Sequence, residues 1–519
     1  MSFFSKWFRR KEKDKDKERT TAEPEIEMEM NTKLQPADRV FDFFREISAI
    51  PRASFDEERI SNYLVSFAKS RNLEVYQDES HNVVIKKPSN IPNCKCPPVI
   101  IQGHMDMVYV QSPDCKRSYE DGVGLLEKDG WLCADGTTLG ADNGIAVAYE
   151  LALLDSDNIP HPDLEMIFTV QEEVGMFGAE NLDCSELKGK YFINLDTEDE
   201  GVFFTSCAGA VRSEVQIPIK YKKIKTDGMK KLVIKLEGLT GGHSGMEIHK
   251  FRGNAIVLLG RLISEADIKG VHLHSMECNG KMNAIANSAK AVLYVENDRL
   301  AEIMKQLESS VADFKHELDG VDNVELNMKI KKCKKKSVFC YSKKSLKRAL
   351  AAISLLPNGM LCMSTKSGIV ETSANMGILT EVDDKLLICS AIRSSVGTKK
   401  KDIARKYKLV AKLCGGYCKL YGDYPQWEYR ENSPLRDIAM DTYREIFGKE
   451  PVVRAVHCGL ECGYFDQKLK DADVISFGPD QEDVHTPKER LNIASVERVW
   501  QLIQAMLEKL GNGEAQENV

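Results

Sequence analysis

The sequence of 519 residues is too long for one ordinary hydrophobic core, so two domains are expected. Apolar residues make up 42% of the chain and charged residues 29%, which excludes a disordered or fibrous protein. The formal net charge of −7 offers no broad basic excess, so no nucleic-acid partner is expected. The 15 cysteines follow no regular spacing, which favours reduced thiols in a cytoplasmic protein.

Residues 1–36 are predicted to form a disordered, charged tail. The tail begins with MSFFSKWF, which combines aromatic side chains with a lysine and precedes a dense charged run. It lacks the apolar core of a signal peptide, and no stretch of roughly eighteen apolar residues occurs in the chain, so neither secretion nor a transmembrane segment is expected. Weak contact of the tail with an anionic membrane surface is the alternative that the sequence leaves open.

The next part of the chain, residues 37–210, alternates short apolar runs with helical stretches. Two amphipathic helices come first, and four strand or helix segments follow: PPVIIQGHMDMV, GIAVAYELALLDS, LEMIFTVQEE and GKYFINLDTED. This alternation predicts an α/β domain with a mostly parallel sheet flanked by helices. Ligands of such domains gather at the carboxyl ends of the strands.

Residues 211–407 have a different pattern, with alternating strands separated by long helices, which predicts an inserted α+β domain. The β-α pattern returns over residues 408–511, and residues 512–519 are a short tail. The simplest topology is one catalytic domain interrupted by another. Within the insert, the run KIKKCKKK at 329–336 is predicted to be an exposed edge strand kept from aggregating by lysine; a binding role is the alternative.

Several strand ends of the α/β domain carry residues that can bind a metal. His104 and Asp106 have a spacing that puts both side chains on one face of a strand, so a carboxylate can hold one ring nitrogen while the other faces a metal. Asp142 opens a helix, where capping is the alternative role. Asp196 ends a strand and His485 lies in a polar loop. Their joint occurrence favours a metal site.

Glu172 and Glu173 stand side by side after the apolar run FTVQ. A continuing strand would point them to opposite faces and bury one carboxylate, so the strand is expected to end before them. A solvated acidic turn is the alternative for an isolated pair.

These motifs together resemble a known family. GHMDMV, GADNG, QEEVGMFGAENL, NLDTED, GGHSGMEIH and GPDQEDVHTPKERLNIASV are similar, in order and spacing, to the two-zinc dipeptidases of the aminoacylase and carboxypeptidase family. The resemblance covers about residues 37 to 510.

The resemblance implies a role for each of the metal-binding candidates. His104 and Glu173 would be terminal ligands on different sides of a metal pair, completed by Asp196 and His485, and Asp142 would bridge the two metals. In the family the bond after the bridging aspartate is a cis peptide, here between Asp142 and Asn143. The three carboxylates and a bridging hydroxide would balance two Zn²⁺ ions, although Mn²⁺ or Co²⁺ suits the same oxygen and imidazole donors.

The resemblance also implies the residues that act on the substrate. Glu172 would be the general base that activates the bridging hydroxide, and Asp106 would orient His104. His243 would steady the oxyanion. Three residues would hold the C-terminal carboxylate of the substrate: Asn283, Arg393 and Gly459.

The function implied is metal-dependent hydrolysis of dipeptides, Xaa-His and broader, with β-Ala-His among the candidate substrates. The alternatives are an N-acyl amino acid deacylase, a tripeptide aminopeptidase, or a non-catalytic binding relative. His457 and Glu461 lie near the substrate motif and are given no ligand role; a structural hydrogen bond is favoured for His457. A homodimer is a candidate assembly, and the sequence leaves open whether His243 acts in its own subunit or in a partner.

Overall fold

The computed structural model describes residues 34–266, 270–365 and 368–514. The described chain from Pro36 onward forms one compact unit. Residues 1–33 of the predicted N-terminal tail, with the alternative of membrane contact, lie outside the described residues. Within the described ranges, no helix has the length and apolar character needed to cross a membrane.

A mixed, mainly parallel sheet of eight strands forms the centre of the α/β part. Parallel pairing joins β6 to β3, β3 to β7, β7 to β23 and β8 to β22. In spatial order the strands are β1 (Glu74–Gln77), β2 (Val83–Lys87), β6 (Leu164–Thr169), β3 (Val99–His104), β7 (Tyr191–Asn194), β23 (Asp473–Ser476), β8 (Val202–Cys207) and β22 (Val452–Val456). The predicted α/β class is confirmed.

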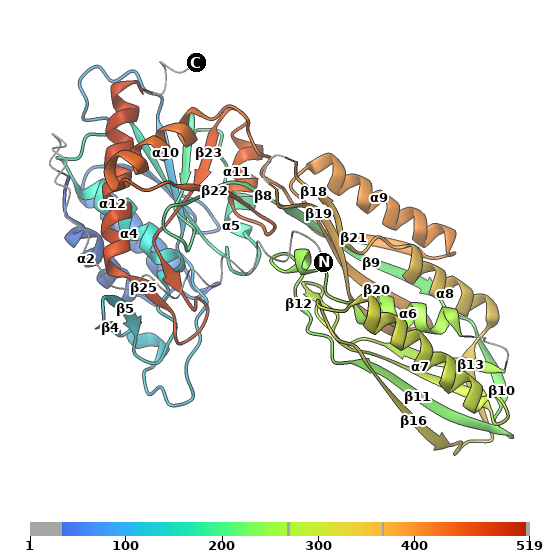
Figure 1. The fold of residues 1–519 in the computed structure, drawn as a ribbon. Helices are drawn as coiled ribbons and strands as arrows, with labels where there is room; N and C mark the ends of the chain where they lie inside the picture. Colours follow the sequence, from blue (N-terminus) through green and yellow to red (C-terminus); the bar gives the residue numbers. More distant parts are fainter. Residues whose placement is uncertain (1–33, 267–269, 366–367, 515–519) are drawn as a thin grey trace. The chain divides into compact units, whose positions relative to one another are not determined.

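Helices cover both faces of this sheet (Figure 1). One face packs against α2 (Asp38–Ser48), α3 (Glu58–Ser70), α4 (Ala141–Asp155), α10 (Pro434–Phe447) and α12 (Ile493–Asn512). The other face packs against α5 (Phe177–Asn181) and α11 (Cys462–Lys468). Tyr149 of α4 stacks on Trp500 of α12 with ring centroids 6.0 Å apart, which ties an early helix to the last one.

A small antiparallel sheet lies beside this core and holds the polar loop of the C-terminal part. Its strands are β24 (Gln481–Glu482), β25 (Arg490–Asn492), β5 (Trp131–Ala134) and β4 (Leu125–Lys128). Because β24 and β25 pair with each other, the loop between them, which contains His485, is closed at its base.

The insert is built on two antiparallel sheets that share one apolar core with four helices. One sheet has the order β13 (Val271–Glu277), β15 (Ala289–Glu296), β11 (Met229–Glu237) and β16 (Glu325–Lys332). The other has the order β18 (Gly359–Met363), β19 (Val370–Val382), β20 (Lys385–Ser394), β9 (Gly209–Pro218) and β21 (Tyr417–Tyr424). The helices are α6 (Ala255–Glu265), α7 (Leu300–Glu317), α8 (Lys343–Leu355) and α9 (Gly397–Leu413).

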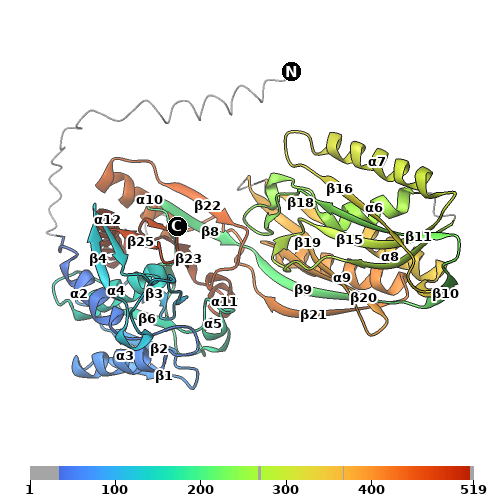
Figure 2. The same cartoon turned by 90° about the horizontal axis from the view of Figure 1, so that it is seen from below.

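The sequence places the C-terminal boundary of the insert at residue 407, and strand pairing favours a later one. Strand β21 pairs antiparallel with β9, so both belong to the sheet of the insert (Figure 2). A helix followed by a strand has the same sequence pattern in either domain, which is why the pattern alone could not place this boundary. We propose that the insert runs from β9 to the end of β21.

The lysine-rich run of the insert is divided between two structures. Lys329–Lys332 lie in β16, which is an edge strand of its sheet, as predicted. Residues 333–336 form the loop that leads to β17 (Ser337–Tyr341), so the expected strand stops short of them.

Candidate metal and catalytic site

The metal-binding candidates gather because neighbouring parallel strands end at the same edge of the sheet. Strand β3 ends at His104, and β6 and β7, which flank it, end at Thr169 and Asn194. Asp196 therefore follows β7 directly, and the glutamate pair follows β6. Asp142 comes from the first turn of α4, and the peptide bond between Asp142 and Asn143 is cis.

The carboxylate of Asp142 lies between two histidines. Its Oδ1 is 3.1 Å from Nε2 of His104, and its Oδ2 is 3.0 Å from Nε2 of His485. Asp196 Oδ1 lies 3.7 Å from Nε2 of His104, and Glu173 Oε1 lies 2.9 Å from Nε2 of His485. The ligand atoms of His104, Asp142 and Glu173 all lie within 4.8 Å of one another. The five residues thus form two donor groups that share Asp142.

The charges of these groups show that positive charge is favoured at this place. Hydrogen bonds to Asp142 and Glu173 raise the pKa of His485 to about 11. Burial opposes protonation of His104, but Asp196 and the other nearby carboxylates raise the pKa of its ring well above the usual value. Burial, together with neighbouring carboxylates, raises the pKa of Asp196 well above its usual value. Oxygen and imidazole donors surrounded by excess negative charge fit divalent cations, which would take the place of these protons.

Asp106 is fully buried and contacts both His104 and the backbone of the glutamate pair. Nδ1 of His104 lies 3.0 Å from the Asp106 carbonyl oxygen and 3.3 Å from its Oδ1, so both acceptors favour a proton on Nδ1 and leave Nε2 free to bind a cation. The same carboxylate accepts hydrogen bonds from Ser54 Oγ and from the backbone N–H groups of Glu172 and Glu173. The sequence predicted the contact with His104, but not the contacts with the glutamate pair.

The glutamate pair leaves the sheet at a sharp bend. Strand β6 ends at Thr169, as predicted, and Gln171 adopts a left-handed conformation with φ of 57°. This bend releases the following residues from the alternation of the strand, so that Glu173 can reach His485. Burial raises the pKa of Glu172 well above its usual value, and Asp196 and the neighbouring carboxylates add to this effect.

Glu489 was missed by sequence reasoning, although it fixes the backbone that carries Asp142. Its buried carboxylate accepts hydrogen bonds from the N–H groups of Leu139, Gly140, Ala141 and Asp142 at 2.8, 3.0, 2.8 and 3.4 Å. Glu489 also lies in the loop that carries His485, so it joins the loops of two candidate ligands. In the sequence it resembles an ordinary charge of a polar loop.

Arg52, also missed, supports the same backbone from the other side. Its guanidinium donates to the carbonyl oxygens of Met105, at 3.0 Å, and Gly140, at 2.5 Å. Burial lowers the pKa of Arg52 to about 10, although Glu489 and other carboxylates oppose this effect. The loop before Asp142 is thus held between a carboxylate that binds its N–H groups and a guanidinium that binds its carbonyl group.

Replacing Glu489 by Gln is expected to weaken metal binding and hydrolysis by about 10- to 100-fold, the usual cost of losing a residue that orients metal ligands. The amide keeps the size of the side chain, but its NH₂ group would face N–H donors that need an acceptor. Metal titration and hydrolysis rates would measure the effect. The matched control is Glu497→Gln, at an exposed glutamate of α12. Parental metal affinity in Glu489→Gln would contradict the positioning role.

A second group of candidates lies in the insert. His243 belongs to β12 (Gly242–His243), which pairs with β14 (Ala284–Ile285). Nδ1 of His243 accepts from the N–H groups of Gly245 and Met246 at 3.3 and 3.1 Å, so the ring proton is on Nε2. Burial, with Arg393 nearby, lowers the pKa of His243 and keeps the ring neutral at neutral pH. A neutral imidazole with a proton on Nε2 is a hydrogen-bond donor.

Arg393, Gly459 and Asn283 are positioned by local contacts. Arg393 is largely buried and donates from Nη1 to the hydroxyl of Tyr424 at 2.9 Å. A Cβ atom at Gly459 would lie 2.6 Å from the Tyr424 ring and 3.1 Å from Cε of Met176, so a side chain is excluded there. Asn283 is exposed, and its backbone carbonyl oxygen accepts a hydrogen bond from the backbone N–H of Ser244. Asn283 thus lies beside His243. Gly459 lies beside Tyr424, whose hydroxyl binds Arg393.

The Gly459 loop lies against the turn of the glutamate pair. The N–H of Met176 donates to the carbonyl oxygen of Glu172 at 3.0 Å, and Cε of Met176 is the atom that approaches Gly459. This contact places Gly459 beside the turn that carries the glutamate pair.

A line of buried polar side chains crosses the sheet beneath the site and ends at Glu461. Ser476 donates to Asn194, Asn194 donates to Gln102, and Gln102 and Thr169 both donate to Oε2 of Glu461, at 2.6 and 2.7 Å. Burial raises the pKa of Glu461 to about 7. These bonds explain why polar residues occur in otherwise apolar strands.

His457 is held by a hydrogen bond, as the sequence interpretation favoured. Its Nε2 lies 2.7 Å from Oγ of Ser373. Burial lowers the pKa of His457 to about 3, so the ring is neutral.

Comparison with known proteins supports this assembly of motifs. A family model described as peptidase family M20/M25/M40 matches residues 100–509. The chain is 33% identical over 477 residues to the cytosol non-specific dipeptidase of Escherichia coli (strain K12), which covers 91% of this chain and 97% of the relative. The structure of this chain is similar to the crystal structure of aminoacylhistidine dipeptidase from Vibrio alginolyticus, with a TM-score of 0.86 and 32% identity. The match covers 93% of this chain and 98% of the dipeptidase.

A more distant structure shares the fold alone. A tripeptidase from Staphylococcus aureus has a TM-score of 0.56 at 17% identity, covering 92% of this chain and 99% of the tripeptidase. The family match and the two dipeptidases confirm the resemblance inferred from the motifs. The chain belongs to peptidase family M20/M25/M40 and is a hydrolase that acts on peptide bonds.

Proposed function

We propose that this chain is a cytoplasmic metallo-dipeptidase that hydrolyses Xaa-His and other dipeptides, including β-Ala-His. The observation that carries the proposal is the carboxylate of Asp142, which faces a different histidine with each of its oxygens. The similarity to two dipeptidases over more than nine-tenths of their length supports the choice of dipeptides.

The metal ions would be held by the five residues of the two donor groups. His104 and Asp196 would bind one cation and His485 and Glu173 the other, with Asp142 shared between them. Zn²⁺ suits these oxygen and imidazole donors, and Mn²⁺ or Co²⁺ suits them as well. When bound, two divalent cations polarise a peptide carbonyl and lower the pKa of an attacking water.

The chain's own residues would move the protons. Glu172 takes a proton from the attacking water at its carboxylate oxygen and gives it to the nitrogen of the leaving amine. Its backbone N–H is held by Asp106, which fixes the position of the base. Nε2–H of His243 donates to the oxygen of the scissile carbonyl as negative charge develops there. Its neutral state and fixed ring proton support this role.

The substrate would be selected through its C-terminal carboxylate. Arg393 offers a guanidinium fork suited to a carboxylate, assisted by Asn283 and by Gly459, where a side chain is excluded. Fixing that carboxylate close to the metals favours dipeptides over longer peptides. A homodimer in which His243 acts in the partner is a candidate assembly, and action within one subunit is the alternative.

The proposal is tested by a substrate panel on metal-depleted enzyme and after addition of Zn²⁺, Mn²⁺ or Co²⁺. The panel contains β-Ala-His, Gly-His, the C-terminal amide of Gly-His, a tripeptide and an N-acetyl amino acid. We expect hydrolysis of the two dipeptides only after metal is restored, and poor hydrolysis of the amide because it lacks the carboxylate.

Three outcomes would replace the proposal with another function. Preferred hydrolysis of the tripeptide would indicate an aminopeptidase, and preferred hydrolysis of the N-acetyl amino acid would indicate a deacylase. Metal-loaded protein without activity on any substrate would indicate a non-catalytic relative.

A further inference from the structure

A second region of the insert concentrates positive charge far above the average of the chain. Residues 220–231 and 329–336 together contain twelve lysines and one acidic residue, Asp227. This lysine-rich end has a net charge of +11, so the remaining chain has −18, given the total of −7. Its lysines are Lys220, Lys222, Lys223, Lys225, Lys230, Lys231, Lys329, Lys331, Lys332, Lys334, Lys335 and Lys336.

Two turns that are distant in sequence meet at the lysine-rich end. One joins β10 (Tyr221–Lys225) to β11, and the other joins β16 to β17. The backbone N–H of Thr226 donates to the carbonyl oxygen of Lys336 at 3.1 Å. The hydroxyl of Thr226 donates to the carbonyl oxygen of Lys335. Strand β10 also pairs with β17. The charge concentration therefore rests on a defined arrangement of two chain segments.

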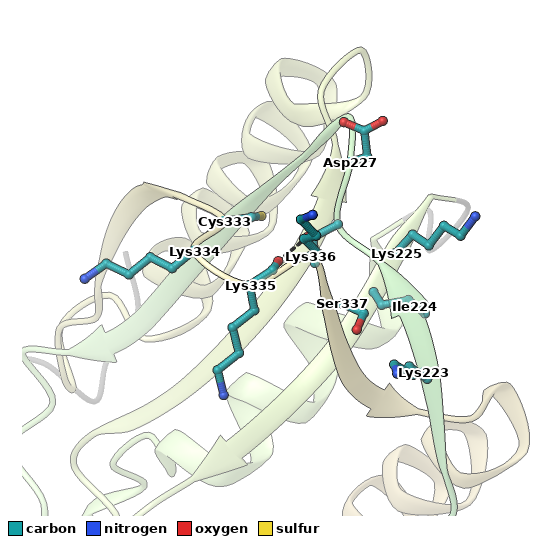
Figure 3. Close-up of a pocket in the computed structure, with 10 residues that line it drawn as sticks. Lys223, Ile224, Lys225, Asp227, Cys333, Lys334, Lys335, Lys336 and Ser337 are labelled. Carbon is teal, nitrogen blue, oxygen red and sulfur yellow. Dashed lines mark hydrogen bonds between the residues drawn. The ribbon is translucent and has the colours of Figure 1, made fainter.

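The lysine side chains do not converge on one small ligand. The two turns border a hollow of about 830 Å³, but Figure 3 shows Lys334, Lys335 and Lys225 pointing away from one another. Within the described part of the chain, no ion pair with a carboxylate is found for any of the twelve lysines. Splayed, unpaired ammonium groups suit an extended anionic surface better than a single compact anion.

Protection of an edge strand accounts for only part of this charge. Lysines on β16 protect an exposed edge, as its place at the end of the sheet requires. Lys230 and Lys231, however, lie on β11, which has a neighbour on each side. Lys334–Lys336 lie in a turn, outside any strand. Their presence calls for another reason.

Large apolar side chains are exposed among the lysines. Phe339 is 58% exposed and lies opposite Lys223 in the β10–β17 pair. Ile330 of β16 is 49% exposed. Lysines interspersed with a few exposed apolar side chains match the chemistry of an anionic lipid surface, where ammonium groups meet headgroups and apolar groups enter the interface. Recognition of nucleic-acid bases relies on arginine forks and aromatic platforms, and the two segments contain no arginine.

We propose that the lysine-rich end is a docking surface for membranes that contain anionic lipids. The contact is electrostatic and reversible, and it is separate from the residues proposed for peptide hydrolysis. Each lysine near such a membrane contributes roughly a fivefold increase in partitioning.

The test measures sedimentation of the full chain with phosphatidylcholine vesicles that do or do not contain about one-third phosphatidylserine. We expect binding to the anionic vesicles only, and weaker binding as salt is added. The variant Lys334→Gln/Lys335→Gln/Lys336→Gln is expected to bind the anionic vesicles at least ~10-fold more weakly. The matched control replaces three exposed lysines of α9 in the same way: Lys401, Lys408 and Lys412.

Dipeptide hydrolysis at the parental rate by both triple variants would show that they are folded. Equal vesicle binding by the turn variant and the parent would overturn the proposal, because another part of the chain would then carry the contact. An equal loss in the α9 control would also overturn it. The proposal would also be overturned if the parent protein did not bind the anionic vesicles, or if it bound a single-stranded RNA more strongly than the vesicles.

Discussion

Replacing Glu172 by Gln is expected to reduce dipeptide hydrolysis by about 10² to 10⁴-fold while the protein keeps its metal. The amide has the size of the carboxylate but cannot accept the proton of the attacking water. Among the described residues, the Glu172 carboxylate forms no hydrogen bond or ion pair with the two donor groups, so its replacement should not change the number of bound metal ions. Hydrolysis of β-Ala-His or Gly-His, together with metal analysis of the same samples, measures both effects.

The experiment separates a base from a residue that only shapes the site. A structural role would allow Glu172→Gln to retain hydrolysis at the parental rate, and that result would contradict the assignment. A raised KM with unchanged kcat would indicate lost substrate binding and would contradict it as well.

The same change one residue later, Glu173→Gln, is expected to have a different effect. Oε1 of Glu173 lies 2.9 Å from Nε2 of His485, in one of the two donor groups. An amide there removes a negative charge from the group, so one of two metal ions should be lost or bound far more weakly. Metal content after dialysis is the measurement, and hydrolysis should fall with the lost metal.

The two variants serve as matched controls for each other, because they make the same isosteric change at adjacent positions. If Glu172→Gln lost metal and Glu173→Gln retained it, Glu172 would be the metal ligand and Glu173 the base. Retention of both metal ions in Glu173→Gln would remove Glu173 from the proposed ligands. A high excess of Zn²⁺ should restore part of the activity of Glu173→Gln by mass action. It should restore no activity to Glu172→Gln, because that variant lacks the base.

Much of the architecture followed from the sequence because its pattern is local. Alternating apolar runs and helices predicted the α/β core, and the strand containing FTV was expected to end before the glutamate pair, as β6 does. Polar residues at the ends of neighbouring strands had to lie close together, and the structure brings His104 and Asp196 within 3.7 Å. The roles of these residues came from the family resemblance and remain proposals.

The parts that could not be predicted depend on contacts between distant segments. Glu489 and Arg52 have no periodic pattern, and their function is visible only when the loop before Asp142 lies between them. The later end that we propose for the insert depends on the pairing of β21 with β9, because α9 and β21 have the same sequence pattern in either domain. The charge concentration at the lysine-rich end likewise depends on the meeting of two segments, of which the sequence had singled out only one.

The order of the donors along the chain has a consequence for biosynthesis. His485 follows Glu173 by 312 residues, after the whole insert, while the other four donors are all translated before the insert. A nascent chain on the ribosome therefore carries one complete donor group, whereas the other group still lacks His485. The proposed dinuclear centre can close only when translation is almost finished, so truncated or incompletely translated chains would lack peptidase activity.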